Sequence, residues 1–99
     1  MPRVMFTISY TIKADRRKDY LELISQLKSH LVHDGKKNYT VYEAKGKKNS
    51  FTEVFLTNSL EEFDALDEGQ DEATEQLVSR IEDLVDEGCK KYNTMIETE

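Results

Sequence analysis

One stretch near the N-terminus constrains the fold more than any other. From Val4 to Ile12, apolar side chains alternate with small and mostly hydroxylated ones. The apolar set is Val4, Phe6, Ile8, Tyr10 and Ile12, and the second set is Met5, Thr7, Ser9 and Thr11. This period of two predicts a β-strand with one face in the protein core. We expect a central strand of a sheet, covered by helices on one side and by something different on the other.

The rest of the chain predicts two helical regions and three more strands. An amphipathic helix is expected over about residues 16–32, where Tyr20, Leu23, Ile24, Leu27 and Leu31 share one face. Strands are expected over Tyr39–Ala44, Phe51–Leu56 and Lys90–Glu97, a capped helix from Ser59, and a longer helix over about 71–87 that ends at Gly88. The order β-α-β-β-α-β predicts a ferredoxin-like α+β fold, with residues 1–99 as a single domain. Both helical regions should cover one face of a four-stranded antiparallel sheet, in which the first and third strands are central.

The register of the predicted hairpin decides which residues share the uncovered face of the sheet. If Val41 lies opposite Val54, then Tyr39 lies opposite Leu56, and one face is cleanly apolar. The uncovered face would then hold Met5, Thr7, Ser9, Thr40, Tyr42, Phe51, Glu53 and Phe55. An aromatic-rich face of this kind needs a cover, which either a second subunit or a ligand would supply.

Charge and composition limit the partners and the compartment. The net charge of -6 argues against a nucleic-acid partner, which needs clustered Lys and Arg. Residues 1–48 carry eleven Lys or Arg and five Asp or Glu, whereas residues 49–99 carry three Lys or Arg and fifteen Asp or Glu. The simpler interpretation is two solvated surfaces of opposite charge. The alternative is a contact between the basic half of one subunit and the acidic half of another. The lone Cys89 and the half-polar first strand indicate a soluble cytoplasmic protein without a signal peptide or a membrane span.

The chain resembles the dimeric α+β barrel superfamily, which includes antibiotic-biosynthesis-type monooxygenases, haem-degrading monooxygenases and stress-responsive barrel proteins. The resemblance rests on the element order, on the strand F-T-I-S-Y-T-I-K, and on the stretch from Phe55 to Phe63, in which a third strand runs into a capped short helix. It implies a homodimer whose two sheets pack face to face, with a pocket in each subunit.

The resemblance does not carry catalytic residues over to this chain. Haem-degrading members use an Asn on the first strand, a Trp and a His. Here Thr7 and Ser9 occupy the first strand, the chain has no Trp, and no His follows His33. Haem degradation is therefore not expected, and we predict no cofactor.

Glu53 is the most suggestive candidate for a functional group. With Tyr42, Phe51 and Phe55 it would place a carboxylate on an aromatic face, where a raised pKa could make it a base. The simpler interpretation, which we prefer, is an intersubunit salt bridge or a hydrogen bond to Tyr42. Thr7 and Ser9 could bind a ligand, although such residues are more often small fillers in a strand, and Ser9 has no neighbouring base for nucleophilic catalysis.

Two histidines form the only candidate metal pair in the sequence. His30 and His33 are three residues apart, a spacing that can present two imidazoles to one metal. Both lie at the predicted end of a helix, where a partly cationic His also suits the helix dipole, so we do not expect a metal site.

Two hypotheses of different classes remain. In the first, a homodimeric barrel binds a small apolar or aromatic molecule and acts on it as a monooxygenase-like enzyme, with Thr7, Ser9, Tyr42, Phe51, Glu53 and Phe55 around the ligand. In the second, the protein is a non-catalytic dimeric module whose sheet face is covered by the partner subunit. A cavity enclosed in the dimer next to Tyr42 and Glu53 would favour the first hypothesis, whereas side chains that fill this space would favour the second.

Overall fold

The computed structural model describes residues 2–34, 37–65, 72–86 and 88–98. Strand β1 (Val4–Thr11) leads through a 3-10 turn into helix α1 (Arg17–Ser29), which continues as a π-helical turn over His30–Asp34. The hairpin of β2 (Asn38–Glu43) and β3 (Ser50–Thr57) follows, and after it come the short helix α2 (Leu60–Asp64), helix α3 (Glu72–Glu82) and strand β4 (Lys91–Ile96).

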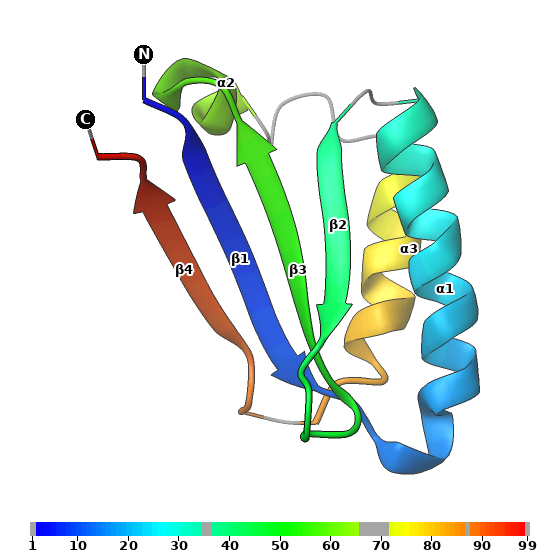
Figure 1. Ribbon diagram of the computed structural model, residues 1–99. Coiled ribbons are helices and arrows are strands. Elements are labelled where there is room, and N and C mark those ends of the chain that lie inside the picture. The colour runs from blue at the N-terminus through cyan, green and yellow to red at the C-terminus, as the bar shows by residue number, and fades with distance from the viewer. Residues whose placement is uncertain (1, 35–36, 66–71, 87, 99) are drawn as a thin grey trace.

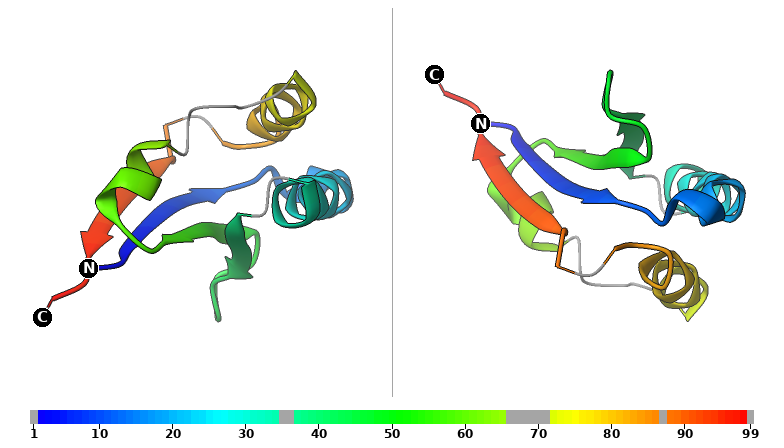
Figure 2. Two further views of the ribbon diagram at one scale, coloured as in Figure 1. Left: turned by 90° about the horizontal axis from the view of Figure 1, so that it is seen from above. Right: turned by 90° about the horizontal axis from the view of Figure 1, so that it is seen from below.

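The four strands form one antiparallel sheet in the order β2-β3-β1-β4. Helices α1 and α3 lie side by side on one side of the sheet (Figures 1 and 2). The ferredoxin-like fold and the central positions of β1 and β3 are therefore confirmed. Of the side chains that the β1 alternation assigned to the core, Val4, Tyr10 and Ile12 are almost fully buried, whereas Phe6 and Ile8 are half-buried.

Helix α2 begins as its sequence predicts. The Ser59 hydroxyl accepts a hydrogen bond from the Glu62 backbone N–H at 3.2 Å, and the Glu62 carboxylate accepts one from the Asn58 backbone N–H at 2.9 Å. These two bonds satisfy backbone donors that would otherwise be unpaired at the start of the helix.

The end of α3 differs from the prediction. The helix ends at Glu82, not near residue 87, because the following residues pair with the end of β1. Val85 forms a β-bridge with Ile12, and the Asp86 backbone N–H donates to the Thr11 carbonyl at 2.9 Å. Gly88, with φ of 74°, lies in the turn before β4 and does not cap α3.

The predicted register of the hairpin is wrong. The structure pairs Val41 with Glu53 and Tyr39 with Phe55, one residue away from the predicted pairing of Val41 with Val54. Because side chains alternate along a strand, this difference turns Phe51, Glu53 and Phe55 toward the helices. Two phenylalanine rings remove more apolar surface from water than Val54 and Leu56 would. The buried Glu53 carboxylate is compensated there by a tyrosine hydroxyl.

Candidate functional site

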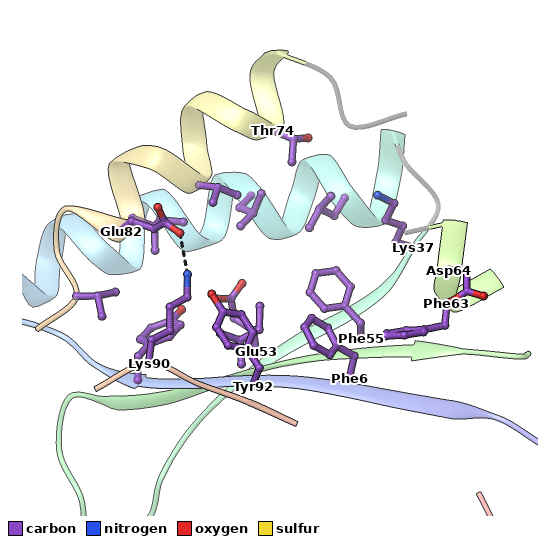
Figure 3. Close-up of a pocket in the computed structure, with 17 residues that line it drawn as sticks. Phe6, Lys37, Glu53, Phe55, Phe63, Asp64, Thr74, Glu82, Lys90 and Tyr92 are labelled. Atoms are coloured by element: carbon purple, nitrogen blue, oxygen red, sulfur yellow. Dashed lines mark hydrogen bonds and ion pairs between the residues drawn. The ribbon is translucent and has the colours of Figure 1, made fainter. Parts of the chain in front are cut away.

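A cavity of about 570 Å³ lies between the helix-facing side of the sheet and the helices (Figure 3). Its lining comes from three strands, from all three α-helices, and from the segments that lead into β2 and β4. The lining residues are Phe6, Ile8, Tyr10, Leu27, Leu31, Lys37, Glu53, Phe55, Phe63, Asp64, Thr74, Val78, Ile81, Glu82, Val85, Lys90 and Tyr92. Most of them are apolar or aromatic, with a few charged groups among them, as is typical of small-molecule sites.

Aromatic rings form one wall of this cavity. The Phe6 ring lies near the rings of Phe55, Phe63 and Tyr92, at centroid distances of 6.2, 5.7 and 6.2 Å. The Phe6 and Tyr92 rings are nearly parallel, at 17°. We call Phe6, Phe55, Phe63 and Tyr92 the aromatic wall. Rings in this arrangement offer an apolar surface on which another planar ring can stack.

Glu53 is the buried carboxylate of the cavity. It is 7% exposed, and the Tyr39 hydroxyl donates a hydrogen bond of 2.5 Å to its Oε1. Loss of hydration on burial raises the pKa of Glu53, although the hydroxyls of Tyr39 and Tyr10 oppose this effect. A carboxylate with a raised pKa in an apolar cavity can accept a hydrogen bond from a ligand or take a proton from it.

Two further tyrosines, Tyr10 and Tyr20, form a hydrogen-bonded pair near this carboxylate. The hydroxyls of Tyr10 and Tyr20 are 2.7 Å apart, and both side chains are buried. Burial raises the pKa of both hydroxyls, and the negative charge of Glu53 raises it further. Both tyrosines therefore remain protonated and can act as hydrogen-bond donors around Glu53.

Two charged side chains, Lys90 and Glu82, lie in the part of the cavity that holds Glu53. Lys90 Nζ lies 2.7 Å from Glu82 Oε1, as the dashed line in Figure 3 marks, and 5.4 Å from the centroid of the Tyr92 ring. Burial lowers the pKa of Lys90, but its interactions with Glu82 and Tyr92 outweigh burial and raise the pKa overall. The ammonium group is therefore charged at neutral pH.

The structure divides the predicted ligand-binding residues between the two sides of the sheet. Glu53 and Phe55 line the cavity. Phe51 faces the same side but is buried against the Tyr20 ring, at a centroid distance of 4.4 Å.

Thr7, Ser9 and Tyr42 point to the opposite side, which we call the outer face. The Ser9 hydroxyl lies 2.9 Å from that of Thr52, and Tyr42 is 61% exposed. The predicted contact between Tyr42 and Glu53 is therefore wrong, because the two residues lie on opposite faces of the sheet.

Sequence reasoning missed most of the cavity lining. Phe6 and Tyr10 were assigned to a packed core, and Lys90, Glu82 and Tyr92 were not singled out. The alternation of β1 places Phe6 and Tyr10 on the helix-facing side, so a correct hairpin register would have joined them to Glu53 and Phe55.

The two histidines lie apart from the cavity lining. His30 and His33 belong to the π-helical turn that follows α1, where His30 is half-buried and His33 is exposed. Among the residues that the structure describes, no group of three or more His, Cys, Asp or Glu side chains could hold a metal ion. None of the helices in these same ranges is long and apolar enough to cross a membrane.

The fold is shared with solved structures of the antibiotic-biosynthesis-monooxygenase type. A conserved protein from Methanosarcina mazei Go1 matches with a TM-score of 0.82 and 11% identity over 99% of this chain and 95% of that chain.

Two further solved structures match in the same way. SnoaB, a cofactor-independent oxygenase from Streptomyces nogalater, matches with a TM-score of 0.73 and 10% identity, over 100% of this chain and 96% of that chain. An antibiotic biosynthesis monooxygenase matches with a TM-score of 0.71 and 12% identity over 97% of each chain. The sequence matches no protein-family model and no curated protein. At these identities the likeness establishes the fold.

Proposed function

We propose that the protein binds a small, largely apolar aromatic molecule in the cavity between its sheet and its helices. The observation that carries this proposal is a cavity of about 570 Å³ in which an aromatic wall adjoins one buried carboxylate, Glu53. Pockets of roughly 300–1,000 Å³ hold drug-sized molecules. The binding mode invokes no cofactor.

Each part of the lining has a role in this binding mode. Phe6 and Phe55 contact the faces and edges of the ligand rings, and the aliphatic side chains of α1 and α3 cover the other side. A ligand hydroxyl donates a hydrogen bond to Glu53, which gives the site polar specificity. An apolar ring without a hydroxyl binds less tightly because the buried carboxylate then keeps an unused acceptor.

Narrowing the cavity tests the proposal. Val78 lines the cavity from α3, so Val78→Phe should weaken binding of 1-naphthol at least tenfold, measured by titration calorimetry or by the fluorescence of the probe. Leu21→Phe is the matched control, because Leu21 is 42% exposed on the outside of α1. Equal binding by both variants would mean that the probe does not enter the cavity.

A second candidate is oxygenation of the bound molecule, which the raised pKa of Glu53 and the similarity to SnoaB favour. Glu53 would take a proton from an arenol, and the electron pair of the resulting anion would form a carbon–oxygen bond with O₂. Glu53 would return its proton to the peroxide anion, and loss of water, made from the O–OH bond and the hydrogen on the same carbon, would leave a carbonyl group on the ring. The test is O₂ uptake with a dihydroxynaphthalene: Glu53→Gln should abolish the enzyme-dependent rate, and Tyr42→Phe should leave it unchanged.

We also propose that the protein is a homodimer in the cytoplasm. A row of apolar side chains, Met95, Met5 and Leu56, crosses the outer face from β4 through β1 to β3, and Met5 and Met95 are 37% and 49% exposed. A second copy of the chain would cover this row. The alternative function is a non-catalytic dimeric structural or regulatory module, in which the partner subunit covers this face.

A further inference from the structure

Lys90 brings a positive charge to the edge of the aromatic wall. Its ammonium nitrogen lies 5.4 Å from the centroid of the Tyr92 ring, and that ring is stacked against Phe6. The cation therefore stands at one end of the row of rings that lines the cavity (Figure 3).

The ion pair of Lys90 with Glu82 is unequally buried. The Lys90 side chain is 26% exposed, whereas the Glu82 side chain is 53% exposed. Glu82 is thus the better hydrated partner and can return to water at little cost, because exposed ion pairs contribute little to stability. A ligand anion can take the place of Glu82.

Glu53 and Lys90 lie close enough to influence each other. Both line the cavity, and the positive charge of Lys90 acts on Glu53 to oppose the effect of burial on its pKa. This part of the cavity therefore offers an acceptor for a hydroxyl hydrogen and a donor for an anion. A molecule that carries both groups on one ring satisfies both residues at once.

We propose that Lys90 recognises an anionic group of the ligand, so that the cavity selects a hydroxylated aromatic carboxylate over the neutral arenol with the same rings. This inference rests on the proposed function, since it concerns the same cavity. The ligand carboxylate replaces Glu82 as the partner of Lys90, the ligand rings lie along the aromatic wall, and the ligand hydroxyl donates to Glu53. A charge-assisted hydrogen bond of this kind is about twice as strong as a neutral one.

The test compares 4-hydroxy-2-naphthoate with 1-naphthol, which has the same rings and hydroxyl but no carboxylate. In titration calorimetry the wild-type protein should bind the carboxylate about tenfold more tightly. Lys90→Gln should abolish this preference while binding of 1-naphthol stays within about twofold. Glu82→Gln should strengthen binding of the carboxylate, because it removes the competing anion.

Two variants serve as controls for the folded state and for net charge. Lys91→Gln removes a neighbouring charge on the outer face, where Lys91 pairs with Ser9, and should leave both affinities unchanged. Lys90→Arg keeps the charge and should retain the preference.

Each other outcome has a distinct meaning. If the wild-type protein binds both probes equally, or if Lys90→Gln weakens both equally, Lys90 does not recognise an anion although the cavity still binds aromatic molecules. If the wild-type protein binds neither probe, the proposed function and this inference are both refuted.

Discussion

Glu53 is a carboxylate in a place where the fold otherwise buries apolar side chains. Moving a carboxylate out of water is costly unless hydrogen bonds replace its hydration. The Tyr39 hydroxyl supplies one such bond, and the paired hydroxyls of Tyr10 and Tyr20 lie nearby. The structure thus offsets the burial of Glu53 with tyrosine hydroxyls.

Removal of the Tyr39 hydroxyl should destabilise the protein through Glu53. We expect Tyr39→Phe to lower the free energy of unfolding at pH 8 by roughly 1–3 kcal/mol, because a buried carboxylate then loses a donor. Tyr42→Phe is the control, since Tyr42 is exposed on the outer face, and should change stability by less than about 0.5 kcal/mol. Urea unfolding measures both, and equal effects would contradict the role given to Tyr39.

Glu53 should also make stability depend on pH. Its pKa is raised in the folded protein, so the folded state binds more protons than the unfolded state at pH values just above 4.5. The free energy of unfolding should therefore fall as the pH rises from about 4.5 through the folded pKa. Glu53→Gln should remove this fall. Urea unfolding of both proteins from pH 5 to pH 8 tests it, and parallel curves would contradict it.

At the scale of elements, one cluster joins the β2–β3 hairpin to α1. The Arg17 guanidinium forms two hydrogen bonds to the Glu43 carboxylate, and the same carboxylate accepts from the Asn49 backbone N–H at 2.9 Å. Asn49, at φ of 69°, adopts the left-handed conformation that Asn tolerates well. Arg17 also donates to the Asn49 side chain at 3.0 Å. The cluster therefore ties the end of the hairpin to the start of α1.

This cluster should give the protein an acid-sensitive contribution of the opposite sign. Hydrogen bonds from Arg17 and from the Asn49 backbone lower the pKa of Glu43 to about 2. Its contribution is then complete above about pH 4.5, the ordinary pKa, and is lost as the pH falls toward 2. Glu43→Gln should show a shallower loss of stability between pH 4.5 and pH 2 in urea unfolding. A loss as steep as that of the wild-type protein would show that Glu43 plays no part in it.

The helices and strands could be predicted from the sequence, but the set of β3 side chains that faces the helices could not. The periodicity of residues 4–12 and 16–32 and the capping box at Ser59 each depend on neighbours in the chain, and all three elements formed. The register of β2 on β3 depends instead on tertiary contacts. Phe51 and Phe55 face the helices in place of Val54 and Leu56 because the rings of Tyr20 and Tyr39 pack against them there. No local sequence pattern encodes these contacts.

At the scale of the whole molecule, the two sides of the sheet differ in the residues that they carry. The helix-facing side holds the cavity and its acid, whereas the outer face carries hydroxyl pairs such as Ser9 with Thr52 and an apolar row at the opposite end. The cavity lies on the helix-facing side of the sheet, whereas the apolar row lies on the outer face. Ligand binding and dimerisation can therefore be tested separately.

The apolar row on the outer face gives the test of assembly. We expect a homodimer at micromolar concentration in size-exclusion chromatography with light scattering. Met5→Lys should convert it to a monomer, because Met5 is the middle of the row and a buried unpaired charge disfavours the interface. Ser25→Lys, on the exposed side of α1, adds the same charge and should leave the dimer intact.

Binding of 1-naphthol to the Met5→Lys monomer should persist, since the cavity lies on the other side of the sheet. A wild-type monomer would refute the dimer, and loss of naphthol binding with the dimer would mean that the cavity depends on the partner.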